Sequence, residues 1–82
     1  MINLVINMYK TEKLKKNRVN QGFTIYDMSK LLHISPAYYS QIENKKRRLS
    51  YDMAVMIANI FNLKPDDIFY DNNIISKNSN KM

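Results

Sequence analysis

Residues 24–50 have the sequence TIYDMSKLLHISPAYYSQIENKKRRLS, and this stretch decides the fold. Thr24 is a good helix N-cap, and Asp27 falls in the first turn, where negative charge suits the helix dipole. Three apolar residues follow at helical spacing: Met28, Leu31 and Leu32. The pattern predicts a helix that begins after Thr24 and ends at the break formed by His33 and Ile34.

A second short helix is predicted directly after this break. Ser35 is again an N-cap, and Pro36 stands at the first helical position, where its missing N–H costs nothing. The helix should run to about Asn44, with Tyr39 and Ile42 on one apolar face. Small or polar residues occupy the other faces: Pro36, Ala37, Tyr38, Ser40, Gln41 and Asn44. Two short helices joined by a tight turn predict a helix-turn-helix, which places its second helix in the DNA major groove.

Several side chains are candidates for contacts with DNA. Gln41 has both a donor and an acceptor and can bind adenine bidentately, while Ser40 is a further polar candidate. Ala37 can contact a thymine methyl, and Tyr38 is expected to contact phosphate or sugar rather than only pack at the domain edge. At least two residues of the basic run are expected to anchor phosphates: Lys45, Lys46, Arg47 and Arg48.

Composition narrows the function classes. The 82 residues suit one small domain, and a net charge of +6 suits a polyanionic partner such as DNA. The absence of cysteine excludes disulfides and thiolate metal sites. His33 is the only histidine, and no paired carboxylates, nucleophile–base pair or phosphate-binding loop is present. We therefore expect no enzyme, cofactor or metal. No apolar run approaches the roughly 18–20 residues of a membrane span.

The rest of the chain is predicted to be helical as well. A first helix should span about residues 9–20 and end at Gly22, the only glycine, which suits a left-handed C-cap. A later helix should begin after Ser50 and run to about Phe61, and a short one should open at residues 64–67. The later helix has an apolar stripe for the core: Met53, Ala54, Ile57, Ala58 and Phe61.

These elements define a domain over residues 9–70. Residues 1–8 are expected to be an arm or a short strand, and residues 71–82 a flexible tail. Apolar residues beyond the needs of one small core predict a twofold dimer interface. Its candidate residues are Val55, Met56, Ile60, Phe69 and Tyr70, joined by Ile74 and Ile75. Strand pairing between subunits through residues 1–8 is the alternative.

Residues from about 10 to 70 resemble the Cro and lambda-repressor type of helix-turn-helix regulators, the XRE family. The specific part is Ile34-Ser35, then Tyr38-Tyr39-Ser40-Gln41-Ile42-Glu43-Asn44 and the basic residues. The resemblance implies a compact five-helix, all-α domain that binds operator DNA as a homodimer. It makes one set of residues face the groove: Ser35, Pro36, Ala37, Tyr38, Ser40 and Gln41. Thr24, Asn44 and the residues just after Asn44 would lie near phosphates, and Arg18 and Glu43 would form a partly buried ion pair.

Three residues depart from the family pattern. Ile25 replaces a phosphate-binding glutamine, so only its backbone N–H could serve there. His33 and Lys45 stand where glycine is usual, in the turn and in the loop after the second motif helix. The resemblance implies a cytoplasmic, bacterial or phage-encoded transcriptional repressor. An antitoxin-type autorepressor, or a protein-interaction module that kept the fold without DNA binding, remain alternatives.

Overall fold

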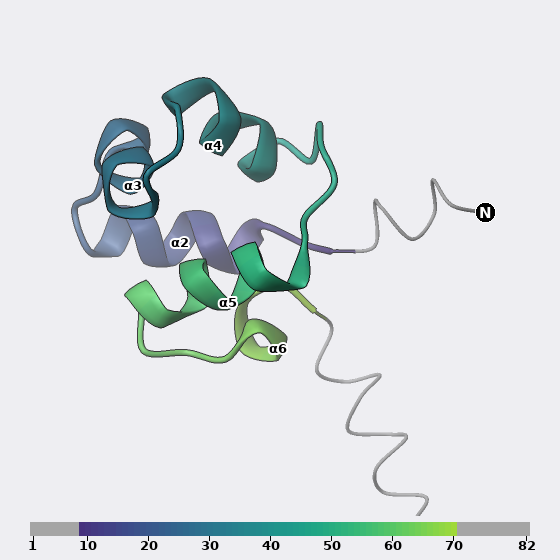
Figure 1. Ribbon diagram of the computed structural model, residues 1–82. Coiled ribbons are helices and arrows are strands. Elements are labelled where there is room, and N and C mark those ends of the chain that lie inside the picture. The colour runs from purple at the N-terminus through teal and green to yellow at the C-terminus, as the bar shows by residue number, and fades with distance from the viewer. Residues whose placement is uncertain (1–8, 71–82) are drawn as a thin grey trace, which may run out of the picture.

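The computed structural model describes residues 9–70, and the predictions for residues 1–8 and 71–82 lie outside this part of the chain. Within residues 9–70 the structure is all-helical, with five helices, as predicted from the sequence. The helices are α2 (Glu12–Asn20), α3 (Ile25–Leu32), α4 (Pro36–Glu43), α5 (Tyr51–Ile60) and α6 (Pro65–Ile68). Figure 1 shows α3 and α4 on one side of α2, with α5 and α6 on the other.

Local hydrogen bonds define the helix starts that the sequence predicts. The hydroxyl oxygens of Thr24 and Ser35 each accept a bond of 3.0 Å from the backbone N–H three residues later, and that of Ser50 accepts one of 3.1 Å. Thr24 and Asp27 form a complete capping box. After α2, Gly22 adopts a left-handed backbone with φ of 77°. The three N-caps and the glycine turn are therefore confirmed.

The first helix begins later than the sequence indicates, at Glu12 instead of Tyr9. Tyr9 precedes the helix and turns its ring into the core, where its side chain is 3% exposed. Its hydroxyl donates to the carbonyl oxygens of Ile42 at 3.2 Å and Arg47 at 2.8 Å. The prediction of a helix from Tyr9 was wrong because these bonds to distant segments hold Tyr9 against α4 and the loop after it.

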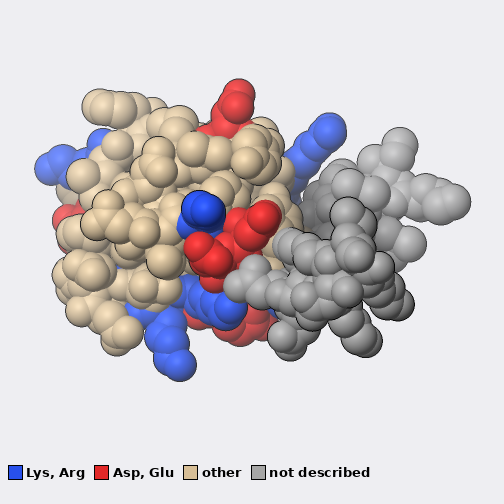
Figure 2. All heavy atoms as spheres, turned by 90° about the horizontal axis from the view of Figure 1, so that it is seen from below, with Lys and Arg blue, Asp and Glu red and all other residues tan. Residues whose placement is uncertain are grey.

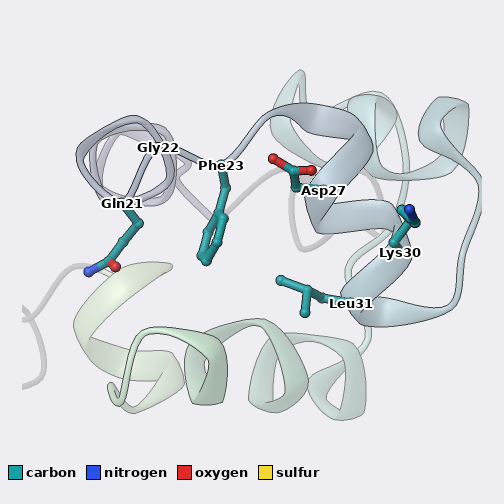
Figure 3. A pocket seen from close by; sticks show the side chains of 6 residues that line it. All are labelled: Gln21, Gly22, Phe23, Asp27, Lys30 and Leu31. Carbon is teal, nitrogen blue, oxygen red and sulfur yellow. The ribbon is translucent and has the colours of Figure 1, made fainter.

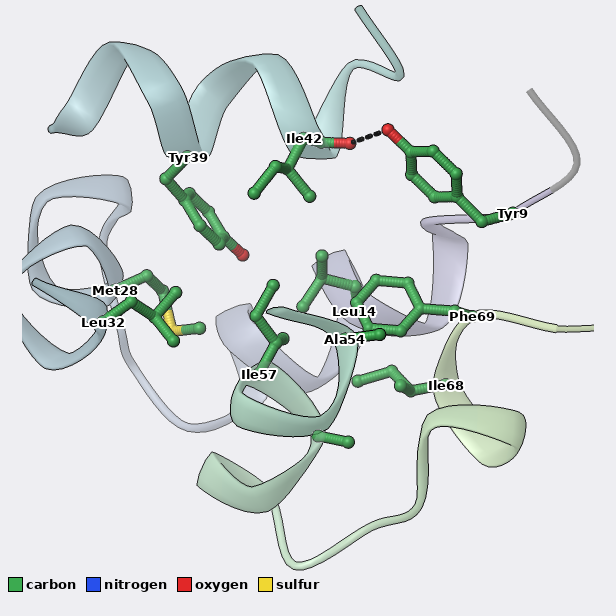
Figure 4. Close-up of a cluster of buried hydrophobic side chains, with 11 residues drawn as sticks. Tyr9, Leu14, Met28, Leu32, Tyr39, Ile42, Ala54, Ile57, Ile68 and Phe69 are labelled. Atoms are coloured by element: carbon green, nitrogen blue, oxygen red, sulfur yellow. Dashed lines mark hydrogen bonds between the residues drawn. The ribbon is translucent and has the colours of Figure 1, made fainter. Parts of the chain in front are cut away.

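The core lies between α2, α4 and α5 and includes the aromatic rings of Tyr9, Tyr39 and Phe69 (Figure 4). Leu14, Met28, Ile42 and Ile57 are fully buried beside them. Tyr9 and Phe69 pack edge to face, with ring centroids 6.2 Å apart. The burial of Tyr39 and Ile42 confirms the apolar face that the sequence assigns to α4.

Leu31 does not join this core. Its side chain is 50% exposed, although the sequence pattern places it with Met28 and Leu32. It lines an open hollow together with Phe23, and Figure 3 shows its side chain pointing from α3 into that hollow. The apolar stripe of α3 is therefore narrower than predicted. Met28 and Leu32, four residues apart, are buried in the core, whereas Leu31, three residues after Met28, is not.

Candidate nucleic-acid interface

Helix α4 presents two different faces. Tyr39 and Ile42 are fully buried and Glu43 is 3% exposed, so these residues form the inner face. The other residues expected at the groove lie at the surface: Ser35, Pro36, Ala37, Gln41 and Asn44 are exposed, and Tyr38 and Ser40 are half-buried. The structure thus brings all of these side chains to the accessible sides of one helix.

The turn into α4 is tight and contains no glycine. His33 adopts a left-handed backbone with φ of 59°, a conformation more tolerable for histidine than for branched residues. Its N–H donates to the carbonyl of Lys30 at 3.2 Å, and the N–H of Ile34 donates to Ser29 at 3.0 Å. These bonds close the C-terminus of α3, so α4 starts in a defined direction.

A buried charge network fixes the other end of α4 to α2. Arg18 forms an ion pair with Glu43 through its Nε, and its Nη2 also donates to Glu43 Oε1 at 3.3 Å. The phenol of Tyr39 donates to Glu43 Oε2 at 2.6 Å. The guanidinium also donates to the carbonyl of Phe23 at 2.9 Å, which ties in the turn after α2. The ion pair implied by the family resemblance is therefore present.

The network raises the pKa values of Arg18 and Tyr39. The hydrogen bond to Glu43 raises the pKa of Arg18 above its usual value. Burial and then the hydrogen bond to Glu43 raise the pKa of Tyr39. Both residues therefore stay protonated throughout the physiological range, and α4 keeps its attachment to α2 there.

The carbonyls at the C-terminus of α4 have partners from the segment before α2. The hydroxyl of Thr11 donates to the carbonyl of Glu43 at 2.8 Å, next to the Tyr9 bond to Ile42. The last carbonyls of a helix lack partners within it. The carbonyl of Ile42 also accepts from the N–H of Lys45 at 3.1 Å, so Tyr9 adds a second bond there. Sequence reasoning missed both capping residues, because the contacts span more than 30 residues and no local pattern marks them.

The basic run follows α4 at once, but its members are not equivalent. Lys45 has a left-handed backbone with φ of 58°, a conformation that glycine adopts most easily. Lys45, Lys46 and Arg48 are exposed, whereas Arg47 is partly buried. Its guanidinium carbon lies 3.9 Å from the centre of the Tyr38 ring, and its Nε donates to Gln41 Oε1 at 3.0 Å.

At the start of α3, the capping box uses most of the polar groups of Thr24. Its N–H donates to Asp27 Oδ2 at 2.9 Å, and its hydroxyl oxygen accepts from the N–H of Asp27. The Thr24 backbone hydrogen bond is the main cause of a lowered pKa for Asp27. Thr24 is exposed, and a side-chain hydrogen bond from Thr24 also lowers the pKa of Asp27, while Ile25 packs against the core.

The residues expected at a dimer surface divide into two groups. Phe69 is fully buried in the core of the single chain, so its assignment to surplus surface was wrong. Met56 is 43% exposed, and Val55, Ile60 and Tyr70 are half-buried. Figure 2, which shows the α5 and α6 side, has a broad area without Lys, Arg, Asp or Glu beside a small charged patch.

The described residues include neither a cluster suited to a metal ion nor a membrane-spanning helix. Over residues 9–70, no group of three or more His, Cys, Asp or Glu side chains is arranged to hold a metal ion. None of the five helices is long and apolar enough to cross a membrane.

Comparison with known proteins assigns the family. Residues 14–68 match the helix-turn-helix family. The chain belongs to this family. The match confirms the XRE-type resemblance, and the family is one of DNA-binding transcription regulators.

One relative is similar over part of the chain. It is described as an uncharacterized HTH-type transcriptional regulator, YqaF, from Bacillus subtilis (strain 168). The two chains are 49% identical over 37 residues, which cover 45% of this chain and 49% of the relative. The chain therefore spans about half the length of this curated relative. No solved structure matches the chain.

Proposed function

We propose that this protein is a transcriptional repressor that binds operator DNA as a homodimer, with α4 in the major groove. The two-sided character of α4 carries the proposal. Its inner face is packed and ion-paired to α2, while its outer face offers small and amide side chains next to a basic loop. This combination suits base contacts from the helix and phosphate contacts from the loop.

The proposed contacts fall into two classes. Lys45, Lys46 and Arg48 are exposed and suit phosphates, which set affinity and register but not sequence preference. Thr24 at the start of α3 and Asn44 at the end of α4 would bind phosphates on either side of the groove. Base contacts would come from the outer face of α4: Ser35, Pro36, Ala37, Tyr38, Ser40 and Gln41.

The dimer would use the apolar edge of α5. Val55, Met56 and Ile60, together with Tyr70, keep apolar surface that the core of one chain does not cover. A twofold dimer would present two α4 helices to half-sites about one helical turn apart. Sedimentation at micromolar protein, with and without operator, tests this part. A monomer under both conditions would refute the dimer but not DNA binding by one domain.

Binding to the gene's own upstream DNA and to a random duplex tests the function directly. Fluorescence anisotropy over about 50–300 mM salt separates specific from non-specific binding. For each phosphate that the protein neutralises, the logarithm of the binding constant falls by about 0.9 per unit of the logarithm of the salt concentration. We expect upstream binding to persist at salt concentrations that abolish random binding. Equal and weak binding to both duplexes would place the operator elsewhere or make the basic charge generic.

Two variants assign the classes of contact. Lys46→Ala should weaken binding to all sequences alike and lower the salt slope by about 0.9. Gln41→Ala should cost roughly 1–3 kcal/mol on the specific site and little on random DNA. Wild-type behaviour of both variants on operator DNA would show that the site is assigned wrongly. No binding to any duplex would favour the protein-interaction module over the repressor. It would also exclude the autorepressing antitoxin, because an autorepressor must bind DNA.

A further inference from the structure

Arg47 is held in place by three separate contacts, unlike its basic neighbours. Its guanidinium stacks on the ring of Tyr38, with 3.9 Å between the guanidinium carbon and the ring centre. Its Nε donates to the side chain of Gln41 at 3.0 Å. Its backbone carbonyl accepts from the buried hydroxyl of Tyr9 at 2.8 Å. The side chain of Arg47 is thus fixed against α4, and its backbone is fixed by Tyr9.

The contact with Gln41 sets the orientation of its amide. A guanidinium carries only N–H donors, so the amide atom that faces it must be the oxygen and not the nitrogen. The Gln41 Nε2 therefore points away from Arg47. Bidentate binding of adenine needs the oxygen and the nitrogen on one base edge together. The oxygen has a second lone pair, but its bond to Arg47 sets the plane of the amide, so the oxygen faces the loop and Nε2 is the atom offered to a base.

We propose that Arg47 is a positioning residue that makes Gln41 a donor-only contact in the major groove. The partner chemistry is an acceptor edge: guanine offers N7 and O6 and thymine offers O4, whereas adenine sets the donor N6–H2 beside its one acceptor, N7. This replaces the expectation of an adenine contact. The inference rests on the proposed function and specifies the bases that the α4 face would select.

A simple role as a phosphate anchor makes a different prediction for the same residue. A phosphate contact carries no sequence information, so its loss weakens all DNA sequences equally. Arg48 is the natural control, because it is adjacent, has the same chemistry and is exposed. Arg47→Met and Arg48→Met each remove one positive charge and all guanidinium donors, while keeping an unbranched side chain of similar reach.

The experiment selects duplexes from a library with a randomised centre at low salt, using the full chain and its variants. The base position whose preference disappears in Gln41→Ala is the one that Gln41 contacts. Wild type should enrich guanine or thymine there. Arg47→Met should raise the adenine share relative to wild type by about fivefold or more, the ratio expected for one base contact. Arg48→Met should leave the base profile unchanged.

A combined variant tests whether Arg47 acts through Gln41. In a Gln41→Ala background, Arg47→Met should have no further effect at that position. Adenine as the wild-type preference, or identical profiles for Arg47→Met and Arg48→Met, would overturn the inference while leaving DNA binding intact. Failure of every library member to bind would instead overturn the proposed function, and the inference with it. Thermal melts of each variant verify that the domain is folded.

Discussion

Replacing Glu43 with glutamine should destabilise the domain by about 3 kcal/mol, because the change removes the negative charge but keeps the shape of the side chain. The side chains of Glu43 and Arg18 are 3% and 16% exposed, so the guanidinium would lose its counter-charge where water reaches it poorly. Removing one partner of a buried pair costs roughly 3–5 kcal/mol. The residual exposure of Arg18 places the expected loss at the lower end of that range.

Urea unfolding near neutral pH, followed by far-ultraviolet circular dichroism, measures this loss. Glu12→Gln is the matched control, because it makes the same chemical change at an exposed position in the first turn of α2. Its effect should stay below about 1 kcal/mol. A loss for Glu43→Gln that does not exceed that of Glu12→Gln would refute the reasoning, since the pair would then contribute no more than a surface charge.

Tyr39→Phe examines the same network from the other side. It removes a hydrogen bond to a charged oxygen and should cost about 1.5–3 kcal/mol. Tyr39 and Arg18 share Oε2 of Glu43, so the double variant Tyr39→Phe, Glu43→Gln should lose less than the sum of the two single variants. Strict additivity would mean that the two bonds do not depend on the same carboxylate.

Three further predictions concern the turns and caps. Gly22→Ala should cost about 1–2 kcal/mol through backbone strain alone, because φ is 77° and an added Cβ meets no atom within 4 Å; a chemical denaturation midpoint equal to wild type would contradict this. Tyr9→Phe should cost about 1 kcal/mol in thermal melts, since the hydroxyl donates to the loop and to α4; an unchanged melting temperature would exclude a capping role. The lowered pKa of Asp27 means that folding favours its charged form, so its contribution to the free energy of unfolding is present above the usual Asp value of about 3.9 and is lost as pH falls through the lower folded value. Wild type should therefore lose its advantage over Asp27→Asn in that acidic window, and parallel pH profiles would argue against it.

The sequence predicts the elements whose signals are local. Thr24, Ser35 and Ser50 each stand directly before a helix and accept a bond from the N–H three residues on. Such bonds depend on residues within one turn, so the order of amino acids is enough to predict them. The inner face of α4 could be predicted for the same reason, because Tyr39 and Ile42 are the apolar pair at helical spacing.

The features that sequence reasoning missed depend on residues far apart in the chain. Tyr9 and Thr11 cap α4 from more than 30 residues away, and both lie before the first residue of α2. The sequence assigns Phe69 to a dimer surface, and its burial depends on packing against Tyr9, which is far away in the chain. The contact of Arg47 with Gln41 depends on the bend of the loop, which composition does not specify.

The backbone N–H of Lys10 donates to the carbonyl of Phe69 at 2.7 Å, so the two ends of the described domain lie side by side. In Figure 1 both ends leave the helices beside α5 and α6, away from the outer side of α4. A circularly permuted chain could therefore join residue 70 to residue 9 through a short linker. New termini could be opened at Asn62, an exposed turn residue between α5 and α6. Helices α2, α3 and α4 would then keep their native order, so we expect the permuted domain to present α4 as the native domain does.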